Sequence, residues 1–340
     1  MTDRDKYFII SVDCGGCRGV IPSMLLNSLG DATVRNADLF AGTSTGAIIA
    51  GGLASGVSIG AINDVYRCTK DCRTIFTPER SGIFGDFGKL LHAQYSSAGI
   101  RSTLEKFPET KKTVGSLDKH CYLPSFLIDG SDADGPQWLA TAFHNFGEAA
   151  GLGGFGHVSV LDAIMGSAAA PMFFNPHQIG TLLFVDGGVM ANNPSMVALA
   201  AATHAGIVGP RGVPIERVCL LSLGTGTTES DYPPEPADWL LGPFGMLGWM
   251  WPTGRGKTTP ALPAMQAQFD GVAQLNDYQV RSILRPDNYR RAELDFGTAS
   301  FPMDDCSKVT GTDGLIERTE RYMATDEWKA IAEWAKERLR

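Results

Sequence analysis

A serine that lies between two glycines is the residue in this sequence whose surroundings most clearly predict chemistry. Gly42, Ser44 and Gly46 follow a short apolar run with the spacing Gly-x-Ser-x-Gly and lead into an apolar, helix-like stretch. Where a buried strand turns sharply into a helix, the corner side chain points outward and the crowded backbones on either side favour glycine. A serine at that corner also lies at a helix N-terminus, where free N–H groups stabilise developing negative charge. The alternative interpretation is a glycine-rich turn with an incidental serine.

A second glycine-rich turn comes earlier in the chain. Residues 7–12 are apolar and predict a buried strand, and the loop 13–19 follows directly. Backbone N–H groups that converge in such a loop can bind an oxyanion or a phosphate. Its glycine spacing matches neither a dinucleotide-binding fingerprint nor a Walker loop. Cys14 and Cys17 have the spacing of half a metal or redox site, but no second pair follows, so we expect no metal there.

A carboxylate with a glycine-rich neighbourhood comes at the end of a later strand. Residues 181–185 predict this strand, and Asp186, Gly187 and Gly188 follow it, before Asn-Asn-Pro and a helix that extends to about residue 204. Taken alone, an aspartate at such a position is best explained as a residue that stabilises the turn.

The order of these motifs resembles that of the patatin-like phospholipase family. The likeness covers residues 7–226 and weakens beyond them, where only Asp277-Tyr278 and Met303-Asp304-Asp305 resemble bacterial members. The loop departs from the family pattern at one position, where Cys14 replaces the first glycine of a run. The segments that carry the resemblance are the loop 13–19, the serine motif 42–46, Asp-Gly-Gly at 186–188, Asn-Asn-Pro at 192–194 and Ser-Leu-Gly-Thr-Gly at 222–226.

The resemblance implies a role for each of these residues and no metal or cofactor. Ser44 would attack an ester carbonyl, and Asp186 would take the serine proton as general base. Because a carboxylate is a weak base at neutral pH, we expect burial to raise the pKa of Asp186. Arg18 would either hold the loop, which is the favoured role, or contact the lipid phosphate. The remaining residues implied are an oxyanion hole at Gly15, Gly16, Cys17 and Arg18, nucleophile-elbow glycines at Gly42 and Gly46, and acid-motif glycines at Gly187 and Gly188.

The activity implied by the resemblance is cleavage of fatty-acyl esters of lipids or phospholipids through an acyl-enzyme. The type expected is a phospholipase A or lysophospholipase. Two alternatives stay open: an acyltransferase that uses the same Ser-Asp dyad, and a ligand-activated phospholipase effector in bacterial defence signalling. A Ser-His-Asp triad is disfavoured, because only His204 follows Asp186 and it lies within an expected helix.

The predicted fold is a three-layer α/β/α patatin-like domain with a central, mainly parallel sheet over residues 1–340. We expect a final core strand at 216–223 and an antiparallel pair of strands at 121–128 and 137–144. Residues 172–174 are candidates for an acyl pocket. Two further segments complete the prediction: an apolar, lid-like insertion around 228–275, and a C-terminal helical segment 276–340 whose amphipathic last helix packs against the body.

Composition limits the partners. The formal charge of −8 disfavours nucleic acid, and the arginines at 281, 285, 290 and 291 are interpreted as a solvated face. No apolar stretch reaches the roughly 18–20 residues of a membrane span. The seven cysteines show no regular framework, which predicts reduced thiols. Expected partners are a lipid or phospholipid substrate, a transient membrane surface, a second copy in a homodimer and a small-molecule activator. The expected location is the cytoplasm, with peripheral contact at the inner face of the membrane.

Overall fold

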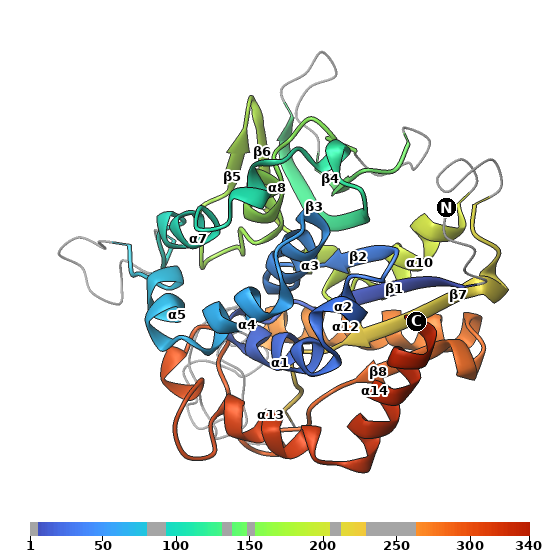
Figure 1. Ribbon diagram of the computed structural model, residues 1–340. Coiled ribbons are helices and arrows are strands. Elements are labelled where there is room, and N and C mark those ends of the chain that lie inside the picture. The colour runs from blue at the N-terminus through green and yellow to red at the C-terminus, as the bar shows by residue number, and fades with distance from the viewer. Residues whose placement is uncertain (1–5, 80–92, 131–137, 148–153, 205–211, 229–262) are drawn as a thin grey trace, which may run out of the picture.

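The computed structural model describes residues 6–79, 93–130, 138–147, 154–204, 212–228 and 263–340, and these residues build one twisted sheet between helices (Figure 1). The sheet has eight strands in the order β5-β6-β3-β2-β1-β7-β8, with β4 also paired to β3. The strands are β1 (Tyr7–Val12), β2 (Leu39–Gly42), β3 (His120–Gly130), β4 (Leu139–His144), β5 (His177–Ile179), β6 (Leu182–Asp186), β7 (Val218–Leu223) and β8 (Tyr289–Ala292).

The centre of the sheet is parallel, and its strands end together. β1 pairs with β2 on one side and β7 on the other, so that Val12 is level with both Gly42 and Leu223. The residues that follow these strands therefore meet at one edge, which is where α/β sheets bind ligands. The predicted mainly parallel sheet is confirmed, and so is the antiparallel pairing of β3 with β4.

The long strand β3 brings a distant strand back to that edge. Ala41 of β2 is level with Tyr122, so the register of β3 continues past the end of β2. Farther along, Ser125 pairs with Asp186 of the antiparallel strand β6. Ser125 is three residues beyond Tyr122, and Ser44 is three residues beyond Ala41. Because Ser125 pairs with Asp186, the last residue of β6, β6 ends at the level of the serine turn.

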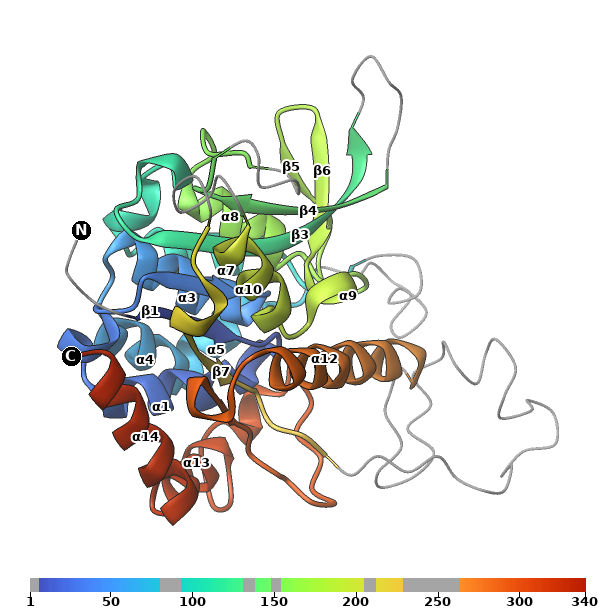
Figure 2. The same ribbon diagram turned by 90° about the vertical axis from the view of Figure 1, so that its right-hand side faces the viewer.

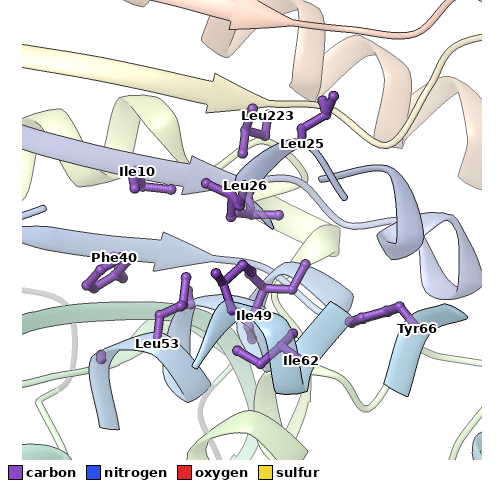
Figure 3. Close-up of a cluster of buried hydrophobic side chains, with 14 of the residues drawn as sticks. Ile10, Leu25, Leu26, Phe40, Ile49, Leu53, Ile62, Tyr66 and Leu223 are labelled. Carbon is purple, nitrogen blue, oxygen red and sulfur yellow. The ribbon is translucent and has the colours of Figure 1, made fainter. Parts of the chain in front are cut away.

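Alternate residues of β1 face opposite layers, as period-two side chains require. Phe8 and Ile10 belong to one buried cluster, and Tyr7 and Ile9 belong to the other. Figure 3 shows the first cluster, in which Ile10 and Phe40 of the strands meet side chains of the covering helices. That layer contains α1 (Val20–Leu29), α2 (Asp31–Val34), α3 (Thr45–Ser55), α4 (Ile59–Arg67), α5 (Thr69–Ile75), α7 (Ala98–Leu104) and α8 (Val160–Ser167).

The opposite layer is formed by α10 (Ser195–Thr203) and α12 (Pro263–Ile283), which lie side by side in Figure 2. The three-layer α/β/α architecture is thereby confirmed. Helix α12 begins within the segment 228–275 that was predicted to be a lid-like insertion. Residues 229–262 of that segment lie outside the described residues. Among the helices that the structure describes, none combines the length and apolar character that crossing a bilayer requires.

The C-terminal segment is more than the predicted helical region. Its strand β8 pairs with β7, so the predicted final strand at 216–223 is followed by another at the sheet edge. After it come α13 (Leu315–Met323) and α14 (Asp326–Arg338). Helix α14 buries Trp328, Ile331 and Trp334 to 6% exposure or less, which confirms that its apolar face packs against the body.

A disulfide joins Cys72 of α5 to Cys306 across 234 residues of sequence. The expectation of reduced thiols is therefore wrong for this pair, while Cys14, Cys17, Cys68, Cys121 and Cys219 are free. No regular cysteine spacing in the sequence predicts such a bridge. Only the packing of α5 against the C-terminal segment brings the two sulfurs together.

Candidate active site

Ser44 occupies the turn between β2 and α3 with a strained backbone. Its φ of 58° and ψ of −116° lie in a region that residues with a Cβ rarely adopt. Backbone atoms lie so close to both flanking positions that only glycine fits there. A Cβ at Gly46 would lie 2.1 Å from the Val12 carbonyl oxygen, and one at Gly42 would lie 2.0 Å from the Gly46 oxygen. The Gly-x-Ser-x-Gly spacing thus reflects close backbone packing at the carboxyl end of the sheet.

Hydrogen bonds hold this turn in place from three sides. The Thr43 hydroxyl donates to the Ala191 carbonyl at 2.6 Å. The Ser44 N–H donates to the Ser167 hydroxyl at 3.4 Å, and that hydroxyl donates to the Pro124 carbonyl at 2.6 Å. The corner serine is thereby fixed relative to β3, α8 and α9 (Gly188–Ala191).

Asp186 is fully buried at the end of β6, with one oxygen bonded and one free. Its Oδ1 accepts from the Gly188 N–H at 2.7 Å. Its Oδ2 is buried and has no hydrogen-bond partner within the described ranges. Burial raises the pKa of Asp186 to about 7, against the opposing effects of the Ser44 hydroxyl and the Gly188 N–H. The expected upward shift is confirmed.

Ser44 and Asp186 are neighbours without a formed hydrogen bond. The serine hydroxyl is near enough to lower the pKa of Asp186, yet Oδ2 makes no bond of good geometry to any described group. Long or misaligned contacts of this kind are common in unliganded catalytic sites. The glycine after Asp186 has a steric reason as well, because a Cβ at Gly187 would lie 2.2 Å from the Pro124 oxygen.

The loop after β1 borders the same cavity as Ser44, because Cys14, Gly16 and Cys17 of the loop line that cavity. Cys17 donates its N–H to the Met303 oxygen at 2.7 Å, and Arg18 donates to the Gly15 oxygen at 3.1 Å. The N–H groups of Gly15 and Gly16 have no acceptor within the described part of the chain. Of the four residues predicted for the oxyanion hole, these two glycines remain as the candidate backbone donors. The Arg18 side chain donates to the Gly226 oxygen at 3.3 Å, in keeping with a loop-holding role.

Three residues that hold this loop were not singled out from the sequence. Thr225 donates its hydroxyl to the Cys14 oxygen at 2.6 Å, and Asn192 accepts the Cys14 N–H at 2.9 Å. Met303 crowds the loop so closely that a Cβ at Gly16, where φ is +58°, would lie 2.2 Å from its oxygen. All three fall within the motifs that resemble the family, which was the one available signal.

Asp13, at the start of the loop, forms a buried ion pair that corrects the interpretation of the C-terminal arginines. Arg291 lies 2.7 Å from the Asp13 carboxylate and also contacts Glu293. Its side chain is only 9% exposed, so it does not belong to a solvated face. Strand β8 explains the placement, because its register sets Arg291 beside Ser222 of β7.

An apolar cavity of about 60 Å³ lies beside Ser44. Phe173 and Phe174 line it, as predicted, whereas Met172 is 38% exposed and does not. A smaller cavity of about 20 Å³ lies behind it and extends to Phe107. Both cavities are apolar and adjacent, because they share the lining residues Ile48, Val65, Tyr66, Ile75 and Ile100.

The alternative chemistries gain no support from the geometry. His204 ends α10 at an exposed position and is not among the residues that line the cavity at Ser44. Within the described ranges, no three His, Cys, Asp or Glu side chains are grouped as metal ligands. Cys14 and Cys17 are both buried, and burial raises the pKa of each thiol, to about 12 for Cys17.

Comparison with known proteins supports the resemblance seen in the motifs. Residues 10–199 match the family model of the patatin-like phospholipases. The chain is 30% identical over 224 residues to CotR of Bacillus subtilis, a candidate sporulation hydrolase, covering 65% of this chain and 63% of that relative. It is 27% identical to a cGAMP-activated phospholipase of Vibrio cholerae, over 98% of this chain and 95% of the relative.

Plant proteins match as well. Patatin-like protein 1 of Arabidopsis thaliana is 28% identical over 84% of this chain and 74% of its own length. Among solved structures, VipD of Legionella pneumophila aligns with a TM-score of 0.41 and 14% identity, over 98% of this chain and 67% of that chain. The family model alone covers more than half of the sequence, and the chain belongs to the patatin-like phospholipase family.

Proposed function

We propose that this protein is a serine acyl hydrolase that cleaves fatty-acyl esters of lipids through Ser44 and Asp186. The observation that carries the proposal is the juxtaposition at one sheet edge. A strained serine opens onto an apolar cavity that Gly16 also lines, and a buried carboxylate is its neighbour. Within the described part of the chain, one oxygen of that carboxylate has no hydrogen-bond partner and the N–H groups of Gly15 and Gly16 have no acceptor. Nucleophile, base and oxyanion donors are the groups that acyl transfer needs.

The first half of the reaction forms the acyl-enzyme. Asp186 takes the Ser44 proton as the serine oxygen attacks the ester carbonyl carbon. The oxyanion that develops accepts hydrogen bonds from the N–H groups of Gly15 and Gly16, each worth about 3–4 kcal/mol in comparable sites. When the tetrahedral intermediate collapses, the ester C–O bond breaks and the leaving alcohol takes the proton from Asp186.

The second half releases the fatty acid. Asp186 removes a proton from water, which attacks the acyl carbonyl, and the proton then returns to the Ser44 oxygen as it leaves. A base with a pKa of about 7 suits both proton transfers near neutral pH. The apolar cavity at Ser44 would hold the acyl chain, which favours a phospholipase A or lysophospholipase type.

Two variants test this assignment. Ser44→Ala removes the nucleophile, and Asp186→Asn removes the base with little change in shape. We expect each to reduce fatty-acid release by at least about a thousandfold while the far-UV circular dichroism stays that of the wild type. Release is measured by mass spectrometry of lipid extracts treated with each purified protein. Retained cleavage by either folded variant refutes the dyad. Transfer of the acyl group to an added alcohol instead of water would identify the acyltransferase alternative.

Ligand activation is a second candidate function. The Vibrio cholerae relative named as cGAMP-activated aligns over nearly the whole length of both chains. We therefore include a small-molecule activator in the proposal. Fatty-acid release measured with and without added cGAMP tests it, and equal rates in both samples reject cGAMP as the activator.

The location and assembly belong to the proposal too. Action on lipid implies transient contact with a membrane surface, while the homodimer stays a prediction. The Cys72–Cys306 disulfide weighs against the cytoplasmic part of the prediction, because disulfides are rare in reducing compartments.

A further inference from the structure

A polar cavity of about 340 Å³ adjoins the apolar cavity at the loop after β1. The two cavities share Cys14, Phe269 and Met303, so they meet at the candidate oxyanion loop. A phospholipid has one apolar arm and one polar arm on either side of its ester. If the acyl chain enters the apolar cavity, the polar cavity lies where the head group must go.

The charges that line this polar cavity are unequal. Its described lining includes five carboxylates, from Asp13, Asp270, Asp277, Glu293 and Glu327, against three guanidinium groups, from Arg18, Arg281 and Arg291. The difference, 5 − 3, is a formal excess of two negative charges, which is complete only above neutral pH because burial raises the pKa of Asp13 to about 7. An anionic head group such as that of phosphatidylglycerol is disfavoured in such a site by like-charge repulsion.

Ion pairing shows which charges are available to a ligand. Asp13 and Glu293 share Arg291, and Asp277 pairs with Arg281. Among the described residues, Asp270 and Glu327 form no ion pair, although each accepts one neutral hydrogen bond, from Gln266 and Tyr322 respectively. Two carboxylates of the cavity thus lack a cationic partner within the described part of the chain.

Arg18 supplies the complementary charge next to the loop. It follows the two glycine donors in the chain, forms no ion pair within the described ranges and bonds only one carbonyl through its terminal nitrogens. Asp270 is on helix α12, directly after Phe269 at the junction of the two cavities. A phosphodiester beside Arg18 and an ammonium group toward Asp270 would satisfy both kinds of charge.

We propose that this polar cavity binds the head group of the substrate and selects zwitterionic, amine-bearing phospholipids over anionic ones. The proposal rests on the acyl hydrolase function above and adds its head-group class. Asp270 acts as a specificity-determining residue through its charge, and Glu327 adds to the same field from the start of α14.

The test compares two lysophospholipids with the same acyl chain, one with an ethanolamine and one with a glycerol head group. Both are presented at low mole fraction in neutral detergent micelles, so that the charge of the surface is constant. The wild type should show a kcat/KM about tenfold higher for the ethanolamine lipid. Asp270→Asn should reduce this ratio about fivefold, and Asp270→Arg should invert it. Glu327→Gln should reduce it less, because Glu327 is exposed.

The control and the contrary outcomes separate this inference from the proposed function. Asp326→Asn removes an exposed carboxylate of α14 that does not line the cavity, and it should leave the ratio unchanged. Equal cleavage of both lipids by the wild type, or an unchanged ratio in folded Asp270→Asn and Asp270→Arg, overturns the head-group assignment and leaves the hydrolase intact. Failure to cleave either lipid or a p-nitrophenyl ester, both with and without added cGAMP, overturns both.

Discussion

The serine turn and the oxyanion loop lie side by side at one sheet edge, yet they are built in different ways. The serine turn is shaped mainly by its own residues, because Gly42 and Gly46 permit the close backbone contacts that its geometry requires. The oxyanion loop is held by residues far away in the chain, among them Asn192, Thr225 and Met303. One half of the site is therefore encoded locally and the other half depends on tertiary packing.

The largest expected effect comes from a substitution in the serine turn, the half of the site that is encoded locally. Gly46→Ala places a methyl group 2.1 Å from the Val12 backbone oxygen, which cannot move without displacing β1. We expect ester cleavage to fall by more than about a hundredfold and the free energy of unfolding to fall by about 3 kcal/mol or more. Urea denaturation and a p-nitrophenyl ester assay measure the two effects.

Gly60→Ala is the matched control. Gly60 is also helical, in α4, but a Cβ there would meet only the Asn27 side chain at 3.8 Å. This change should be neutral or stabilise by up to about 1 kcal/mol. Comparable losses in both variants would show that the serine turn is not specially constrained.

The next effect tests the distant support of the loop. The Cys72–Cys306 disulfide ties α5, which lines the apolar cavity, to the segment that contains Met303. Cys306→Ser should lower the free energy of unfolding by about 2–5 kcal/mol. Thermal denaturation measures it, and reductant should lower the wild-type Tm but not that of the variant. Cys68→Ser, one helical turn from Cys72 and free of disulfide, should leave Tm nearly unchanged. Equal Tm values for Cys306→Ser and the oxidised wild type would contradict the bridge.

The pH dependence sharpens the role of the buried carboxylate. Burial raises the pKa of Asp186 to about 7, so kcat/KM should rise as pH increases through about 7 while the base becomes ionised. Rising pH has the opposite effect on the free energy of unfolding. The folded protein binds this proton between about pH 4 and pH 7 while the unfolded chain has released it, so the free energy of unfolding falls as pH rises through that range and does not fall further above it.

A substitution of Asp186 tests the predicted effect of pH on stability. Asp186→Asn cannot ionise, and at pH 8 it should be more stable than the wild type by about 2 kcal/mol, a difference that shrinks toward pH 5. Chemical denaturation at both pH values measures this. A difference that does not depend on pH would show that Asp186 titrates in the ordinary carboxyl range.

The smallest effect concerns a single contact of the distant half. Thr225→Val removes the hydroxyl that donates to the Cys14 oxygen and should cost about 1 kcal/mol of stability. Because the loop loses a positioning contact, kcat should fall about tenfold with little change in KM. Thr319→Val removes an equally buried hydroxyl bond within α13 and should match the stability loss without the loss in kcat. Equal kcat in the two variants would place Thr225 outside the support of the loop.

The serine turn, which is encoded locally, could be predicted from the sequence, whereas the contacts that hold the oxyanion loop could not. Ser44 and its glycines stand within five residues, so backbone geometry constrains their types and the spacing can be recognised. Because an ordinary carboxylate is a weak base at neutral pH, a general base at Asp186 was expected to be buried. Burial in turn predicts that its pKa is raised. The disulfide, the buried Arg291 and strand β8 leave no such local trace. Arg291 stands in a basic cluster that would normally be solvated, and only its pairing beside Ser222 makes it a partner of Asp13.

By itself, the sequence determined the family, the layered α/β/α fold and the residue types of the reacting groups, because tight turns and alternating apolar strands restrict which residues can occupy them. Tertiary structure alone decided which loop N–H groups have no acceptor among the described residues, how deeply Asp186 is buried and which charges line the polar cavity. Those properties are sums over neighbours that are distant in sequence. A hydrogen-bond donor is free, or a carboxylate unpaired, only when no other segment of the folded chain reaches it.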